Sequence, residues 1–119
     1  MPNPIVHFEV LGKDPLKLQK FYGDLFGWKV QNMAEMGNYG MIEAQEGHGI
    51  GGGVGGSTEG PGHVTFYVEV DDPQAYLDKA AGMGGKIVMP ATDMGVVVYG
   101  LFTDPEGHMI GVVKSDQQH

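Results

Sequence analysis

His7 and Glu9 are the residues whose types and spacing most plainly could do chemistry. They stand two residues apart in Ile5–Leu11 (IVHFEVL), a β-branched and apolar run that predicts a strand. Because side chains alternate along a strand, His7 and Glu9 should share one face, with Phe8 on the other. Imidazole titrates near neutrality and a carboxylate neighbour raises its pKa, so the pair could serve as a general base. Alternatively, the two side chains could simply hydrogen-bond to each other in a solvated groove.

Other reactive groups are scarce. The chain has no Cys, which excludes a thiolate nucleophile, a disulfide framework and a Cys-rich zinc site. Its two serines, Ser57 and Ser115, fall in a predicted linker and in the tail, with no nucleophile elbow around them. The run Gly51–Gly56 formally satisfies G-x-G-x-x-G, but no helix is expected after it. We interpret that match as chance in a glycine-rich strand.

The elements that must position His7 and Glu9 begin with a helix. Asp14-Pro15 supplies a capping side chain followed by proline at the first helical position, and Gly27 ends the run. Strands are then predicted near Trp28–Val30, near Tyr39–Gln45 and near Gly49–Val54. The tyrosines at 39 and 99 could contribute to a site, but strands this short do not show which way they face.

The second half of the chain repeats this order. Asp14-Pro15 matches Asp72-Pro73 at an offset of 58, and His7 then matches Thr65. Further along, the offset becomes 60, where YGMIEAQEGHGIG (39–51) matches YGLFTDPEGHMIG (99–111) at seven of thirteen positions. The repeat predicts an α+β domain of two βαβββ modules whose curved mixed sheets form a cleft, with the helices packed outside. We expect module one at about 4–55, a linker at about 55–62 and module two at about 63–115.

Composition excludes several classes of partner. The net charge is −8, and the seven basic residues are all Lys, so a nucleic-acid backbone would be repelled. Without Arg, the usual bidentate clamp for carboxylates and phosphates is missing, which disfavours a strongly anionic ligand. Met1–Val10 shows no basic region followed by a long apolar run, so we expect neither a signal peptide nor a membrane span, and a cytoplasmic location.

Several segments together resemble one protein family. They are VHFEV, KFYGDLFGW, YVEVDD, MGGKIVMP and FTDPEGHMIG, taken in order and spacing over nearly the full length. The chain resembles the vicinal oxygen chelate superfamily of glyoxalases, bleomycin-resistance proteins and extradiol dioxygenases. The resemblance implies the fold strongly and the function weakly, because its members include metal enzymes, an epimerase and metal-free binding proteins.

The resemblance also implies where a metal would bind. Metal-dependent members take His or Glu ligands from the first and last strands of each module. Those positions fall on His7, Thr65, Gly51 and Gly111, of which only His7 is a good ligand. We therefore expect no metal and no other cofactor. The alternative is a two-His, one-carboxylate set of His7, Glu43 and His63, which would break the repeat register.

Our first functional hypothesis is a homodimer that binds a small neutral or cationic, partly aromatic molecule in its cleft. The predicted ligand-binding residues are His7, Glu9, Thr65 and Tyr67, although Tyr67 could simply pack in the core. A second hypothesis is an enzyme of the same superfamily, lactoylglutathione-lyase-like or dioxygenase-like, with a metal at the non-standard site. A third is an accessory subunit whose cleft is closed by side chains.

Overall fold

The computed structural model describes residues 2–45, 47–57 and 62–115. It divides the chain into two compact units: the first unit is His7–Thr65, and the second unit is Met1–Val6 with Phe66–His119. The division falls within the strands β1 and β5. Of the predicted linker, residues 58–61 lie outside the described residues.

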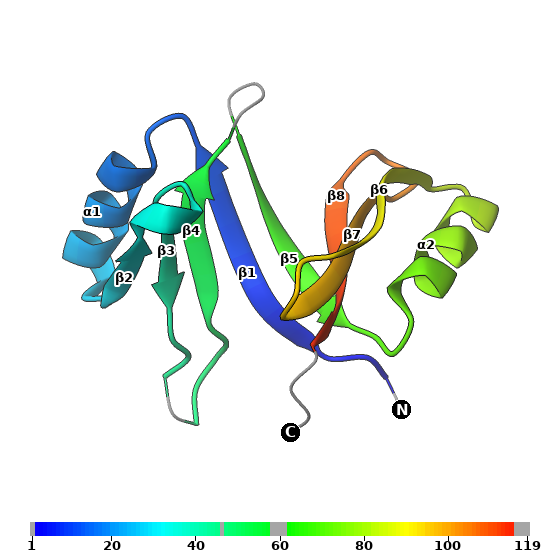
Figure 1. Cartoon of the computed structure of the whole chain (residues 1–119), viewed down its shortest axis with the longest axis horizontal. Coiled ribbons are helices and arrows are strands. Elements are labelled where there is room, and N and C mark those ends of the chain that lie inside the picture. The colour runs from blue at the N-terminus through cyan, green and yellow to red at the C-terminus, as the bar shows by residue number, and fades with distance from the viewer. Residues whose placement is uncertain (1, 46, 58–61, 116–119) are drawn as a thin grey trace. The chain divides into compact units, whose positions relative to one another are not determined.

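Each half of the chain follows the predicted order of strand, helix and three strands (Figure 1). The first half comprises β1 (Ile5–Gly12), α1 (Pro15–Phe26), β2 (Val30–Met33), the short 3-10 helix η1 (Ala34–Met36), β3 (Tyr39–Ile42) and β4 (Gly52–Gly56). The second half comprises β5 (His63–Glu69), α2 (Pro73–Gly82), β6 (Lys86–Asp93), β7 (Val97–Thr103) and β8 (Met109–Ser115). The predicted α+β fold with repeated βαβββ units is therefore confirmed.

Both helices begin at the predicted capping residue. The Asp14 side chain accepts a hydrogen bond from the Lys17 backbone N–H at 3.1 Å, and Asp72 accepts one from Ala75 at 3.2 Å. These bonds satisfy backbone donors that the first helical turn leaves without a partner. At the other end of α1, Gly27 adopts a left-handed conformation (φ 71°) that closes the helix. Within the described residues, neither helix has the length and apolar character needed to cross a membrane.

The strands of the two halves pair in the same way. In the first, β1 runs parallel to β4, and β3 is antiparallel to both β4 and β2. In the second, β5 runs parallel to β8, and β7 is antiparallel to both β8 and β6. In each half the helix packs on its own strands, α1 chiefly on β4 and α2 on β6 and β7. The mixed sheets and outer helices are as predicted.

The strand pairing corrects the repeat register in one place. Gly40 pairs with Val54 and Gly100 pairs with Val112, so β3 and β7 keep the offset of 60. The last strands, however, return to 58, since 112 − 54 = 58. The paired residues Gly40 and Val54 are 14 positions apart in the chain, whereas Gly100 and Val112 are 12 apart, so the first half carries a two-residue insertion that the EGHxIG match spans. The partner of Gly111 in the repeat is therefore Gly53 rather than Gly51.

Each unit has its own small core. In the second unit, Leu77 of α2 is fully buried and packs with Val70 and Val112. In the first unit, Val54 of β4 is fully buried, and the buried Gln19 of α1 donates to the Val54 carbonyl oxygen at 3.1 Å. This hydrogen bond satisfies the buried amide of Gln19 and links α1 directly to the backbone of β4. The opposite face of β1 and β4 is the one that carries His7 and Glu9.

Candidate functional site

A hydrogen-bonded group of three side chains lies on the first unit. His7 and Glu9 project from β1, and Tyr39 stands at the start of β3. The Tyr39 hydroxyl donates to Glu9 Oε2 at 2.8 Å, and the Tyr39 hydroxyl oxygen lies 2.9 Å from His7 Nε2. The His7 and Tyr39 rings are nearly parallel, at 16° with centroids 6.5 Å apart. All three are partly buried, and we call them the His7–Tyr39–Glu9 group.

The strand alternation predicted for β1 explains this arrangement. Phe8, between His7 and Glu9, points the other way and contacts Trp28 beyond the end of α1, with ring centroids 5.6 Å apart. The helix side of β1 is therefore apolar and the other side carries the polar group. Since the pleat reverses side chains at every residue, moving the register by one position would exchange the two faces.

Glycines on β4 make room for the Tyr39 ring. Gly53 pairs with Glu9, and a Cβ added at Gly53 would lie 1.9 Å from the Tyr39 hydroxyl oxygen. A Cβ at Gly55 would lie 2.6 Å from the ring. Both distances are far inside van der Waals contact, so no other residue fits beneath the ring in this position. Gly53 and Gly55 thus form a shelf for the Tyr39 ring. Of the three glycines in the G-x-G-x-x-G match, only Gly53 belongs to this shelf.

The environment of His7 keeps its imidazole neutral. Burial lowers the pKa of His7 below its usual value, and the nearby Glu9 carboxylate opposes this lowering without cancelling it. Burial disfavours the charged imidazolium, whereas a carboxylate stabilises it. At neutral pH the side chain is therefore a neutral imidazole, with one ring nitrogen protonated and the other an acceptor.

The structure brings two of the four predicted ligand-binding residues into this group. Thr65 and Tyr67 lie on β5, where they are 4% and 8% exposed. The Tyr67 ring covers Gly111 of β8, where an added Cβ would lie 2.3 Å from it, and meets the Tyr99 ring edge-on at 6.0 Å. Thr65 and Tyr67 remain predicted ligand-binding residues. Tyr39 was predicted only as a possible contributor, because a short strand does not show which way its side chains face; the structure places it between His7 and Glu9.

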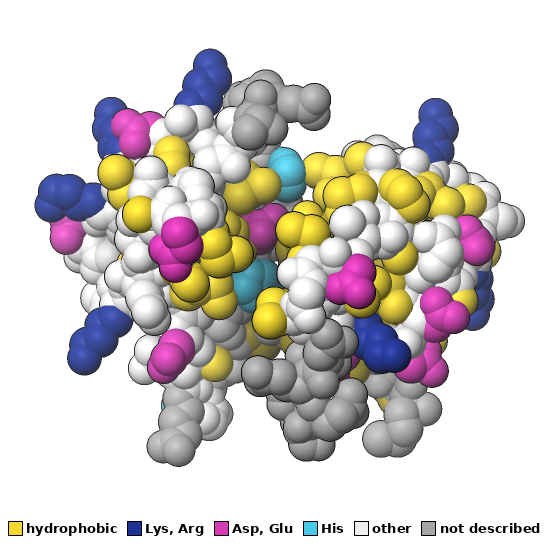
Figure 2. All heavy atoms as spheres, in the orientation of Figure 1, with side chains coloured by type: hydrophobic (Ala, Val, Ile, Leu, Met, Phe, Trp, Pro, Cys, Tyr) yellow, Lys and Arg dark blue, Asp and Glu magenta, His cyan; other side chains and the backbone are white. Residues whose placement is uncertain are grey.

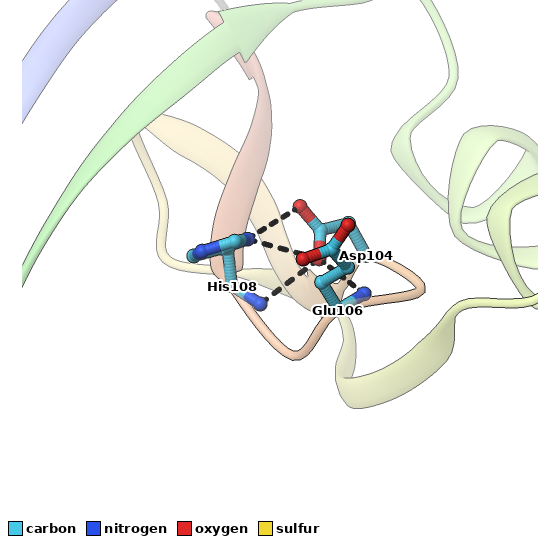
Figure 3. A network of polar contacts seen from close by, with 3 residues as sticks. All are labelled: Asp104, Glu106 and His108. Atoms are coloured by element: carbon cyan, nitrogen blue, oxygen red, sulfur yellow. Dashed lines mark hydrogen bonds and ion pairs between the residues drawn. The ribbon is translucent and has the colours of Figure 1, made fainter.

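The two turn histidines have structural surroundings. Asp104 accepts hydrogen bonds from the backbone N–H groups of Glu106 and His108 at 2.9 and 3.0 Å, and His108 Nδ1 lies 3.0 Å from its Oδ2 (Figure 3). These bonds, chiefly the one from the His108 backbone, lower the pKa of Asp104. In the other hairpin, the His48 N–H donates to the Gln45 carbonyl at 2.8 Å. These contacts give both residues a structural place in their turns.

Comparison with known proteins places the chain in a family. Residues 4–112 match the family model of the Glyoxalase/Bleomycin resistance protein/Dioxygenase superfamily. The chain belongs to this superfamily. It is 32% identical over 111 residues to "Putative glyoxylase CFP32" of Mycobacterium bovis, a match that covers 87% of this chain and 42% of the relative. The chain thus spans less than half the length of the curated relatives it matches.

Solved structures share the fold of this superfamily member. A superfamily member from Vibrio splendidus 12B01 has a TM-score of 0.65 at 16% identity, covering 96% of this chain and all of that one. The Streptomyces coelicolor methylmalonyl-CoA epimerase variant with 2-nitronate-propionyl-CoA has a TM-score of 0.67 at 15% identity, covering 98% of this chain and 96% of that one. At such low identity these likenesses carry the fold alone.

The family membership overturns one prediction. We expected no cofactor. That prediction is wrong, since members such as methylmalonyl-CoA epimerase and the glyoxalases typically use a divalent metal. The expectation rested on residue types at four sequence positions, and such residue types alone do not decide what a member of this fold binds. The strand register moves one of these positions from Gly51 to Gly53, which is also a glycine.

The described side chains do not assemble a ligand set for such a metal. Across the described residues 2–45, 47–57 and 62–115, no three His, Cys, Asp or Glu side chains come together as a ligand set. The alternative set of His7, Glu43 and His63, all described, is therefore not assembled. His7 Nε2 is also engaged with the Tyr39 hydroxyl. These residues alone do not fit a metal held by three such ligands, and we derive no chemical step through one.

Replacing Gly53 by Ala should disrupt the His7–Tyr39–Glu9 group. The added methyl would force the Tyr39 ring off its shelf, which we expect to lower the free energy of unfolding by about 1–3 kcal/mol in urea denaturation. Gly82→Ala is the matched control, because a methyl there meets nothing within 4 Å. Combining Gly53→Ala with Tyr39→Ala should recover part of the loss. Equal stabilities of Gly53→Ala and wild type would contradict the shelf.

His7 should titrate below its usual pKa of 6.5 in an NMR titration of its ring protons. Because the unfolded chain then takes up a proton that the folded protein refuses, the stabilisation is complete above pH 6.5 and declines as the pH falls toward the folded pKa. Wild type should accordingly lose stability relative to His7→Gln as the pH is lowered below 6.5. A His7 midpoint above 6.5 would show that the carboxylate outweighs burial.

Proposed function

We propose that this protein binds small neutral or cationic organic molecules through the His7–Tyr39–Glu9 group, with Thr65 and Tyr67 as further ligand-binding residues. The hydrogen-bonded carboxylate of Glu9 beside an aromatic ring is the observation that carries the proposal. A carboxylate and a tyrosine ring together favour a ligand that is cationic or rich in hydrogen-bond donors, with a flat apolar part. The homodimer and the cytoplasmic location stay predictions.

The charge distribution supports this ligand class. The chain carries 15 acidic and 7 basic residues, and none of the basic residues is Arg. Lysine side chains and acidic side chains are both spread over the surface in view (Figure 2). In the His7–Tyr39–Glu9 group the only charged side chain at neutral pH is a carboxylate. An anionic ligand would meet repulsion there, and a cation would meet attraction.

Three probes of one shape and different charge test the proposal. Benzamidinium, benzamide and benzoate share a ring and differ in charge from +1 to −1. We expect binding to weaken in that order in isothermal titration calorimetry. Glu9→Gln should weaken benzamidinium binding about tenfold or more, because a charge-assisted hydrogen bond becomes a neutral one.

The control for that experiment is Glu35→Gln. Glu35 is exposed on η1 in the same unit, so the variant removes one negative charge without touching the group. Its affinity for benzamidinium should stay within about twofold of wild type. An equal loss in Glu35→Gln and Glu9→Gln would mean that net charge, and not the Glu9 site, sets the binding. Stronger binding of benzoate than of benzamidinium would refute the proposal.

The second candidate is a metal-dependent lyase or dioxygenase of the same superfamily. The 32% identity to a relative named a glyoxylase favours it. Elemental analysis of purified protein and thermal-shift titration with nickel, zinc, manganese and iron(II) test it. If it holds, stoichiometric metal and a saturable rise in Tm are expected, and both should be lost in His7→Ala. Loss in Glu43→Gln as well would identify the non-standard set, whereas no saturable rise with any metal would reject the enzyme.

A further inference from the structure

The buried amide of Gln19 is a polar group at a position where the repeat uses an apolar side chain. Gln19 lies on α1 and is 7% exposed, whereas its counterpart on α2 at the offset of 58 is the fully buried Leu77. Both side chains pack against a glycine of a strand. A Cβ added at Gly40 would lie 2.7 Å from the Gln19 amide carbon, and one added at Gly100 would lie 2.6 Å from a Leu77 methyl. Since an apolar side chain is enough to pack this position, the buried amide indicates a role beyond packing.

The two N–H groups of this amide bond to two separate segments of backbone. Gln19 Nε2 donates to the Asn38 carbonyl oxygen at 2.7 Å and to the Val54 carbonyl oxygen at 3.1 Å, so both of its protons have an acceptor. The Asn38 carbonyl belongs to the peptide group that leads into Tyr39. Val54 stands between the two glycines of β4 that lie beneath the Tyr39 ring. One side chain therefore ties the residue before the ring to the strand under the ring.

The backbone of Asn38 needs a restraint of this kind. It adopts a left-handed conformation (φ 64°), which residues other than glycine rarely take. The Asn38 backbone N–H donates to the Met33 carbonyl oxygen at 3.1 Å, and its side-chain oxygen accepts from Asn32 Nδ2 at 3.1 Å. The bond from Gln19 adds the carbonyl to these anchors. Because β3 begins at the next residue, this conformation sets the direction in which Tyr39 enters the sheet.

From this geometry we infer that Gln19 is a positioning residue for the proposed ligand site. From the helix side of the sheet, its amide holds the Tyr39 ring over β4, and with it the hydrogen bond from the Tyr39 hydroxyl to Glu9. It acts through the backbone carbonyls of Asn38 and Val54. The inference deepens the proposed function, on which its consequence for ligand binding rests. Its consequence for the position of the ring does not depend on any ligand.

NMR of the Tyr39 ring in Gln19→Leu tests the positioning. The variant installs the side chain that the repeat uses, so it keeps the apolar packing and removes both hydrogen bonds. Wild type should show strong NOEs from the Tyr39 ring to the Hα protons of the glycines beneath it, and these should weaken severalfold in Gln19→Leu. A folded Gln19→Leu with wild-type NOEs would overturn the inference.

Gln74→Leu is the matched control for this experiment. Gln74 lies on α2, and its side-chain oxygen accepts a hydrogen bond from the Ala91 N–H of β6 at 2.9 Å. The variant therefore also replaces a helix glutamine by leucine and removes a bond from helix to strand, but in the second unit. The Tyr39 NOEs should stay as in wild type. An equal loss in both variants would mean that the ring responds to general loosening and would overturn the inference.

Two measurements keep the test decisive if Gln19→Leu does not fold. Gln19→Met keeps an unbranched chain of similar length without the donors, and it should show the same weakening of the NOEs. In wild type, the side-chain amide protons of Gln19 should exchange with solvent about tenfold or more slower than those of Gln31, which is exposed on β2. Equally fast exchange at both residues would contradict the two hydrogen bonds and overturn the inference.

Titration with benzamidinium tests the consequence for binding. Gln19→Leu should bind it about three- to tenfold more weakly than wild type, because the Glu9 carboxylate loses a fixed partner, whereas Gln74→Leu should stay within about twofold. If benzamidinium does not bind to wild type, the proposed function fails and the NOEs alone decide the role of Gln19. If Gln19→Leu loses the NOEs but binds as tightly as wild type, Gln19 does not serve the ligand site and the inference is overturned.

Discussion

The close approach of the Tyr39 ring to the glycines of β4 is the constraint on which the polar face of the first unit depends. Tyr39 can reach Glu9 and His7 because Gly53 and Gly55 have no side chains beneath its ring. Glycine in a strand interior costs stability, since it loses more freedom on folding and packs nothing. Here that cost is offset by a partly buried ring and by a hydroxyl with a partner on each side.

The repeat carries a second version of the same three positions with different chemistry. Glu9, Tyr39 and Gly53 correspond to Tyr67, Tyr99 and Gly111 at offsets of 58, 60 and 58. In both units an aromatic side chain covers the glycine of the last strand, Tyr39 over Gly53 and Tyr67 over Gly111. In the first unit, β1 supplies the Glu9 carboxylate beside the covering ring of Tyr39. In the second unit, β7 supplies the Tyr99 ring beside the covering ring of Tyr67. The two units share one backbone plan, but the side chains form a hydrogen bond to a carboxylate in the first unit and an edge-on aromatic pair in the second.

This divergence bears on what membership of the superfamily means for this chain. The family uses one scaffold for metal chemistry and for binding, and the scaffold alone does not choose between them. The glycine of each last strand contributes no ligand atom, and His7 Nε2 is already bonded to a phenol. What the first unit offers is a carboxylate hydrogen-bonded to a tyrosine hydroxyl. Our proposal that the protein binds small neutral or cationic molecules rests on this arrangement.

The sequence by itself determined the elements and their order, because the signals are local. A capping Asp followed by Pro starts each helix, apolar alternation marks the strands, and the offset of 58 exposes the duplication. It also placed His7 and Glu9 on one face and Phe8 on the other, since the pleat follows from residue spacing alone. The superfamily followed from the order of these segments.

Tertiary structure decided what the spacing could not. The EGHxIG match pointed to Gly51, whereas strand pairing selects Gly53, because hydrogen bonds between strands fix the register and turn motifs do not. The role of Tyr39 was hidden for the same reason: it lies 30 residues from Glu9 in the chain, and only the pairing of β3 with β4 and of β4 with β1 brings them together. Residue types and local periodicity are written in the sequence, but contacts across a sheet arise only when the strands pair.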